Sequence, residues 1–215
     1  MLYPLFFENR SEIIHKWVHY FPVYERHLKD FINKSTLLFE IGVFRGGSLK
    51  MWKKYLGPFT CVVGIDINPD CQKYTDKQCK IRIGDQADPA FLQTLIDEFG
   101  LPDIVIDDGS HMMRDVNASF DFLYPLLKNN GVYIVEDMHA SYWSDFGGGL
   151  KKDGTFIEKA KDLVDKLNAW HVREQQLVDE FTKSTFSVCF YDSMVVFEKR
   201  IRQRPYDVYI GNDAL

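Results

Sequence analysis

The sequence lacks several features that would assign it to familiar protein classes. Its four cysteines form no C-x-x-C pair, which argues against a thiolate metal site or a redox motif. No apolar run is long enough to cross a bilayer, and no basic leader precedes a hydrophobic stretch at its start. The 26 lysine and arginine residues are scattered, and the net charge is −5. We therefore expect a cytoplasmic protein with reduced cysteines and with no membrane or nucleic-acid partner.

The spacing of apolar residues predicts one α/β domain. The 215 residues contain no internal repeat, low-complexity tract or linker that would mark a second domain. Short apolar runs alternate with amphipathic stretches, a pattern typical of βα units that build a parallel sheet. Parallel strands are predicted at residues 37–41, 61–65, 81–83, 104–106 and 132–135.

The two ends of the chain carry different patterns. Residues 11–33 predict a helical segment that Pro22 interrupts. Towards the other end, a predicted helix precedes two β-rich runs at 186–191 and 194–198, which Asp192-Ser193 joins as a plausible hairpin turn. Such a hairpin would add an antiparallel edge to the parallel sheet.

Each predicted parallel strand ends in an acidic residue. These acids are Glu40, Asp66, Asp85, the pair Asp107-Asp108 and the pair Glu136-Asp137. Ligands of open α/β sheets bind at the carboxyl ends of the strands. For any single acid, capping of the following helix explains its position equally well. That explanation is strained for all five positions together, so a ligand site is predicted at this edge of the sheet.

The first of these strands runs into a glycine-rich turn that opens a helix. Gly42, Gly46 and Gly47 allow the turn to approach a ligand closely, and Asp66 is placed to accept hydrogen bonds from ribose hydroxyls. Phe44 stands where a dinucleotide fingerprint requires glycine, which disfavours NAD and favours a nucleoside without phosphates. The candidate cofactor-binding residues are Glu40, Gly42, Gly46, Ser48, Asp66, Asp85, Gln86 and Asp107, with Asp85 and Gln86 assigned to the adenine edge.

The acids after the fourth and fifth strands suggest a metal site. Carboxylates that converge in one crevice repel one another, and a hard cation such as Mg²⁺ or Mn²⁺ resolves the repulsion. Alternation along the strand turns Asp107 to the side opposite Asp108, towards the cofactor or the sheet. His111 follows on the same loop and could act as a general base, with a surface histidine that makes only a local hydrogen bond as the alternative.

Three groups of residues resemble the macrocin and mycinamicin sugar O-methyltransferases. They are Glu40-x-Gly42 with Gly46-Gly47-Ser48, the run Asp107-Asp108-Gly109-Ser110-His111, and Glu136-Asp137 followed by Ser141-Tyr142-Trp143. The segment from His15 to Tyr24 is similar to the stretch that covers the cofactor in that family. The resemblance implies a Rossmann-like, seven-stranded, mostly parallel sheet with helices on both faces, which binds S-adenosylmethionine.

The resemblance also implies the chemistry of the site. Asp108, Glu136 and Asp137 would hold Mg²⁺, and His111, with Asp108, would act on a hydroxyl of a sugar or glycoside. Residues 142–149 then predict a mobile lid with glycine hinges, in which Tyr142 and Trp143 lie against the sugar ring. His139 supports the lid or contacts the substrate. Core packing is the alternative explanation for each of the two aromatic residues.

Other functions fit parts of the same sequence. A catechol-like phenol could replace the sugar as acceptor, since the resemblance extends to catechol O-methyltransferases. Asp108 or Glu136 with His111 and His139 could form the iron site of a non-heme oxygenase, but the nucleoside half would then lack a purpose. A non-catalytic S-adenosylmethionine-binding module should have lost the acids. The sequence leaves a homo-oligomer open.

We therefore divide one methyltransferase domain, residues 1–215, into five parts. They are an N-terminal helical cap (1–35), a cofactor-binding core (36–137), a lid (138–155), a helix with the terminal hairpin (156–199) and a tail (200–215).

Overall fold

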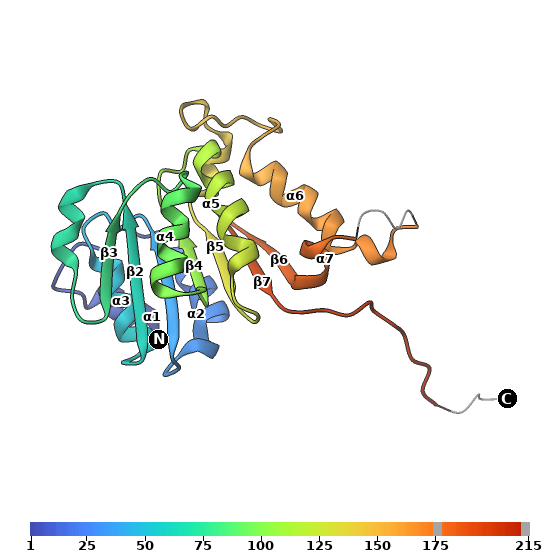
Figure 1. Ribbon diagram of the computed structural model, residues 1–215, viewed down its shortest axis with the longest axis horizontal. Helices are drawn as coiled ribbons and strands as arrows, with labels where there is room; N and C mark the ends of the chain where they lie inside the picture. Colours follow the sequence, from blue (N-terminus) through green and yellow to red (C-terminus); the bar gives the residue numbers. More distant parts are fainter. Residues whose placement is uncertain (174–177, 212–215) are drawn as a thin grey trace.

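A seven-stranded sheet organises the fold of the computed structural model, which describes residues 1–173 and 178–211. The strand order is β3-β2-β1-β4-β5-β7-β6, and the first five strands are parallel (Figure 1). The parallel strands are β1 (Thr36–Ile41), β2 (Thr60–Asp66), β3 (Cys79–Ile83), β4 (Ile104–Asp107) and β5 (Val132–Val135). All five predicted parallel strands are present, so the α/β assignment is confirmed.

The remaining two strands form the predicted antiparallel hairpin. β6 (Thr185–Tyr191) and β7 (Met194–Lys199) pair with each other, and β7 pairs antiparallel with β5. The turn between them consists of Asp192 and Ser193, and Ser193 has a φ of 60°. β6 therefore forms one edge of the sheet, and β3 forms the other.

Helices cover both faces of the sheet, as Figure 1 shows. The helices α4 (Pro89–Phe99), α5 (Met113–Leu126) and α6 (Phe156–Leu167) pack on one face. The opposite face carries α1 (Leu2–Phe7), α2 (Phe21–Leu28) and α3 (Gly47–Leu56). Strand alternation supplies both apolar cores, since Leu38 belongs to the core under α3 and Phe39 to the core under α4. A short helix, α7 (Glu180–Ser184), leads into β6.

The N-terminal region differs from the sequence prediction. Residues 11–17 form no helix, although their apolar spacing predicts one. Pro22 lies in the first turn of α2, where a missing N–H costs no hydrogen bond, so it begins a helix and does not interrupt one. The helix α1 lies within the residues assigned to the N-terminal helical cap, before the helical segment predicted at residues 11–33. Short 3₁₀ turns complete the chain at Val18–Tyr20, Lys29–Phe31, Pro69–Tyr74, Met138–Tyr142, Ser144–Phe146 and Ala169–His171.

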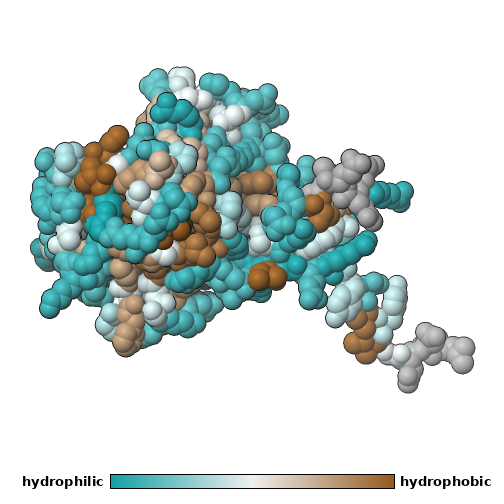
Figure 2. Space-filling model, viewed as in Figure 1, coloured by the Kyte–Doolittle hydropathy of each residue, from teal (hydrophilic) through white to brown (hydrophobic). Residues whose placement is uncertain are grey.

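Residues 200–211 leave the domain as an extended tail (Figure 1). Tyr206, Tyr209 and Ile210 of this segment are exposed, and hydrophobic atoms stand out near its end in Figure 2. Within the described ranges, no helix combines the length and the apolar character needed to cross a membrane.

Candidate active site

The parallel register brings the predicted site residues to one edge of the sheet. Ile41 at the end of β1 pairs with Asp107 at the end of β4, and Asp107 pairs with Val135 at the end of β5. The next residues along these strands, Gly42, Asp108 and Glu136, therefore begin three neighbouring loops. This is the position at which open α/β sheets bind their ligands.

Two cavities open along this edge and share three lining residues. The larger has a volume of about 640 Å³ and the smaller about 290 Å³, and both are lined by Gly42, Asp66 and Gly109. Together they fall in the range of small-molecule sites. The larger cavity is also lined by Lys16, Tyr20, Asp108, His111, Glu136 and Asp137, and the smaller by Gly84, Asp85 and Gln86. The predicted nucleoside and metal halves thus lie next to each other.

Asp66 fixes the glycine-rich turn after β1. Its Oδ2 accepts hydrogen bonds from the backbone N–H groups of Val43 and Phe44 at 2.8 and 3.1 Å. Gly42 in this turn has a φ of +93°, and a Cβ there would lie 2.0 Å from the carbonyl oxygen of Asp108. Only glycine therefore allows the turn after β1 to pack against the loop after β4.

Several predicted cofactor contacts lie behind the cavity wall. Asp107 is buried and accepts hydrogen bonds from Gln86 Nε2 at 3.1 Å and from Ser119 Oγ at 2.5 Å, as the predicted alternation with Asp108 requires. Burial raises the pKa of Asp107 to about 6, against these hydrogen bonds, which lower it. Gln86 in turn accepts a hydrogen bond from the backbone N–H of Ser110. Asp107 thus supports Gln86, which itself lines the smaller cavity.

Glu40 and Ser48 are also turned away from the cavities. The Glu40 carboxylate is fully buried between β1 and α3, where it accepts hydrogen bonds from Ser48 Oγ at 3.0 Å and Trp52 Nε1 at 2.9 Å. Burial raises the pKa of Glu40, although these donors oppose the shift. The hydrogen-bond partners of this buried acid are therefore side chains of the protein itself. Gly46 faces the ring of Tyr74 across the turn.

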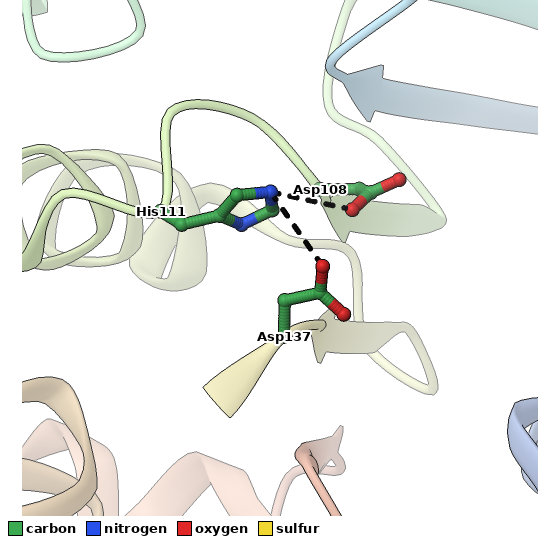
Figure 3. A group of neighbouring side chains, drawn as sticks. All are labelled: Asp108, His111 and Asp137. Atoms are coloured by element: carbon green, nitrogen blue, oxygen red, sulfur yellow. Dashed lines mark ion pairs between the residues drawn. The ribbon is translucent and has the colours of Figure 1, made fainter. Parts of the chain in front are cut away.

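Asp108, His111 and Asp137 form a group that could hold a metal ion. One ligand atom from each lies within 4.8 Å of the others. Figure 3 shows the imidazole of His111 pointing at both carboxylates, and its Nε2 is 3.8 Å from Asp108 Oδ1 and 3.7 Å from Asp137 Oδ2. The three side chains are 20–24% exposed, so the group is open to the larger cavity. Two carboxylates and an imidazole suit a divalent cation with open positions.

Glu136, the third predicted metal ligand, has a different partner. Both of its carboxylate oxygens accept hydrogen bonds from Lys16 Nζ, at 2.9 and 3.0 Å. Lys16 Nζ also donates to Asp108 Oδ2 at 2.6 Å and lies 3.8 Å from Glu40 Oε1. The structure therefore brings Asp108 and Asp137 together with His111 and leaves Glu136 outside this group.

Lys16 is a site residue that the sequence analysis missed. Its side chain is 2% exposed. Burial alone would lower the pKa of Lys16, but the carboxylates of Asp108, Glu136 and Glu40 raise it well above the usual value, so the ammonium stays charged. One signal could have identified it: a buried excess of acids needs cations, and Lys16 lies in the segment that resembles the family's cofactor cover.

Tyr20 is a second missed residue and holds Asp137. Its hydroxyl donates to Asp137 Oδ1 at 2.7 Å, and it accepts a hydrogen bond from the Asp137 backbone N–H at 3.2 Å. Asp137 has a φ of 53° and His111 a φ of 57°, so both lie in the left-handed region that few non-glycine residues adopt. Such conformations cluster at functional sites, where the surrounding structure stabilises them.

The predicted lid folds into two 3₁₀ turns closed by its own backbone. Gly148 N–H donates to Trp143 O and Gly149 N–H to Ser141 O, both at 2.8 Å. Tyr142 and Trp143 are about half exposed, so the alternative explanation that these two side chains pack in the core is disfavoured. His139 forms a hydrogen bond between its Nδ1 and Ser193 Oγ, and its ring centroid lies 4.6 Å from that of Trp143. His139 therefore lies outside the group of Asp108, His111 and Asp137. The placement of His139 does not support the alternative of a non-heme iron site, which would need both His111 and His139.

Comparisons with known proteins show that the chain is similar to sugar O-methyltransferases. No protein-family model matches it. It is 36% identical over 197 residues to the 8-demethyl-8-alpha-L-rhamnosyl tetracenomycin-C 2'-O-methyltransferase of Streptomyces olivaceus, covering 86% of this chain and 52% of that protein. It is 38% identical over 165 residues to the demethylmacrocin O-methyltransferase of Streptomyces fradiae, covering 71% of this chain and 41% of that protein. The chain spans about half, or less, of the length of these curated relatives.

A solved structure agrees with this assignment. The MycE methyltransferase of the mycinamycin pathway, in complex with Mg, SAH and mycinamycin VI, superimposes with a TM-score of 0.83 at 29% identity. The match covers 99% of this chain and 56% of that chain. By sequence and by fold, the chain is similar to the macrocin- and mycinamicin-type sugar O-methyltransferases over about half, or less, of their length.

Proposed function

We propose that the chain transfers a methyl group from S-adenosylmethionine to a hydroxyl oxygen of a sugar or glycoside, with the help of a divalent cation. The observation that carries the proposal is the shared lining of the two cavities. Gly42 and Asp66 face the same space as Asp108, His111 and Asp137. A nucleoside site and a cation site therefore meet where a methyl donor and a hydroxyl acceptor would have to meet.

Different residues would bind the cofactor, hold the metal ion and accept the proton. Asp66 and the turn at Gly42 would hold the ribose and methionine parts of the cofactor, and Asp85 and Gln86 the adenine. Asp108 and Asp137, with Glu136 if Lys16 releases it, would hold Mg²⁺ or Mn²⁺. A bound divalent cation would lower the pKa of a sugar hydroxyl and orient it. His111 would accept the hydroxyl proton, because its imidazole points into this group (Figure 3).

An aromatic surface that suits a sugar ring lies near this group, since the Phe146 ring centroid is 6.3 Å from that of His111 and 5.9 Å from that of Trp143. Tyr142 and Trp143 present half-exposed aromatic faces on the segment after β5, and His139 contacts Trp143. Aromatic faces bind the apolar faces of sugars while leaving the hydroxyls free. We propose these three residues as substrate contacts, and residues 138–155 as the lid within a single domain of residues 1–215. The cytoplasmic location, the lack of a nucleic-acid or membrane partner, and a homo-oligomer stay predictions.

An acceptor panel tests the proposed substrate class. Mycinamycin VI, a rhamnosyl glycoside and a catechol would each be incubated with S-adenosylmethionine and Mg²⁺, and the products analysed by mass spectrometry. We expect a gain of one methyl group on a sugar oxygen. Transfer to the catechol alone would replace the sugar by a phenol as acceptor, and the absence of binding of S-adenosylmethionine in calorimetry would overturn the whole proposal.

A further inference from the structure

We propose that Lys16 and a divalent cation compete for Glu136 and Asp108, so that loading of the metal site releases the N-terminal segment of residues 11–17. The inference rests on the proposed function, since it concerns the same acids. It adds one step to the proposed binding of the metal. The ammonium group of Lys16 must move away before Glu136 can bind the metal ion.

The contacts of Lys16 carry the first step. Its ammonium group uses both oxygens of Glu136, at 2.9 and 3.0 Å, and Oδ2 of Asp108, at 2.6 Å. The side chains of Lys16 and Glu136 are 2% and 1% exposed, so solvent does not screen the pair. A metal ion held by Glu136 would stand about 2 Å from an oxygen that Lys16 already contacts. A monovalent and a divalent cation at that separation repel each other strongly in a buried site.

The two carboxylate oxygens of Asp108 face different partners, which separates the Lys16 side of the site from the cavity side. Its Oδ2 faces Lys16, whereas its Oδ1 faces His111 and the cavity. The side facing the cavity offers Asp108 Oδ1, Asp137 and His111, and the side facing Lys16 offers Glu136 and Asp108 Oδ2. Glu136 can join the cavity side only if Lys16 withdraws. His111 would then be free of the metal and available as the base.

The anchoring of residues 11–17 supports the third step. This segment has no helix or strand of its own, and Ile13 and Trp17 are exposed. Two side chains tie it to the domain by ion pairs, Lys16 to the acids and Glu12 to Lys50 on α3. Because Lys16 is the buried one of these two anchors, its displacement would loosen the segment that lines the larger cavity.

Calorimetric titration with Mg²⁺ tests the competition. Lys16→Met should bind Mg²⁺ roughly tenfold more tightly than the parent, since the competing charge is gone. Lys16→Arg keeps the charge and should stay close to the parent. Lys50→Met removes the other anchor of the segment without changing the acids, so it should also leave the affinity for Mg²⁺ unchanged. A residue with a merely structural role would not produce tighter binding when it is removed.

Hydrogen exchange of the parent protein provides the second readout, which does not depend on any variant folding. Addition of Mg²⁺ at constant ionic strength should increase exchange within residues 11–17. Equal or weaker Mg²⁺ binding by Lys16→Met, or unchanged exchange in the parent despite Mg²⁺ binding, would overturn the competition while leaving the proposed function intact. If no form of the protein bound Mg²⁺, the proposed function and the inference would fall together.

Discussion

The acids at the edge of the sheet differ in what each side chain faces. Glu40 and Asp107 are buried and accept hydrogen bonds from Ser48, Trp52, Gln86 and Ser119. Asp66 faces the cavities, and so do Asp108 and Asp137. Similar residues at equivalent strand ends therefore do different things: some stabilise the loops, and others remain available for a ligand.

Replacement of His111 tests its assignment as the base. His111→Ala should lower the rate constant for methyl transfer by roughly 10²–10⁴, the usual contribution of a positioned base, and should leave the affinity for S-adenosylmethionine nearly unchanged. His171→Ala, at an exposed histidine on the last 3₁₀ turn, serves as the matched control. Parental rates in both variants would remove His111 from the mechanism.

Replacement of Asp66 tests the cofactor assignment. Asp66→Ala should weaken the binding of S-adenosylmethionine, measured by calorimetry, by about 1–3 kcal/mol, because ribose hydroxyls and the N–H groups of Val43 and Phe44 would lose their acceptor. Asp97→Ala on the exposed side of α4 is the control. Unchanged affinity in Asp66→Ala would contradict the placement of the ribose.

At the scale of elements, local sequence patterns predicted the strands correctly but failed for the N-terminal segment. Short apolar runs and strand-end acids depend on neighbours in sequence, so the five parallel strands and the hairpin were recognisable. Residues 11–17 were wrongly predicted as helix because their conformation depends on distant partners. Lys16 pairs with Asp108 and Glu136 across 92 and 120 positions of sequence, and no local pattern reveals such contacts.

The same limit applies to the site. Asp108, His111 and Asp137 could be predicted to converge, since the ends of adjacent parallel strands meet. Which of the acidic side chains face the cavity and which face the interior could not be predicted from the sequence, because this depends on which hydrogen-bond donors reach each acid. Trp52 reaches Glu40 from α3, and Ser119 reaches Asp107 from α5.

The turn after β1 offers a prediction with an internal control. Gly42 and Gly100 both have positive φ values, +93° and +88°, so alanine is strained at each, by about 1–3 kcal/mol. A Cβ at Gly42 would also meet the backbone of Asp108, whereas nothing lies within 4 Å at Gly100. Gly42→Ala should therefore lose more free energy of unfolding than Gly100→Ala and should also lose cofactor binding. Equal effects in denaturant titrations would show that the close approach is unimportant.

A partly buried cluster joins α2 to the hairpin and gives a pH-dependent prediction. His27 contacts Glu198 at 2.9 Å and Tyr191 at 2.8 Å, and Ser187 donates to Glu198. Burial would raise the pKa of Glu198, but Ser187 and His27 lower it below its usual value. A lowered pKa means that the charged carboxylate stabilises the fold at neutral pH and that this stabilisation is lost as the pH falls through the folded-state pKa.

Glu198→Gln should accordingly reduce the free energy of unfolding by about 1 kcal/mol at pH 7. The difference from the parent should shrink when the pH is lowered to about 4, since the carboxyl of the unfolded chain, which has the ordinary glutamate pKa, takes up a proton before the folded one does. Urea titrations at both pH values measure the two differences. A difference that stays constant with pH would mean that the charge of Glu198 does not stabilise this link.

At the scale of the whole molecule, the chain matches about half of the length of its relatives, or less, and this part contains both the proposed nucleoside site and the proposed cation site. The N-terminal segment contributes Lys16 and Tyr20, the sheet edge contributes the acids, and the segment after β5 contributes the aromatic surface. These parts come from positions more than 100 residues apart, so the site forms only when the whole domain has folded.

The proposed methyl transfer requires a divalent cation held by the acids at the edge of the sheet. The most direct test measures turnover with S-adenosylmethionine and a glycoside acceptor after treatment with excess chelator. We predict that chelation abolishes turnover, that Mg²⁺ restores it, and that S-adenosylmethionine binding survives in between. Full turnover in excess chelator, or an Asp137→Ala variant as active as the parent, would contradict the account.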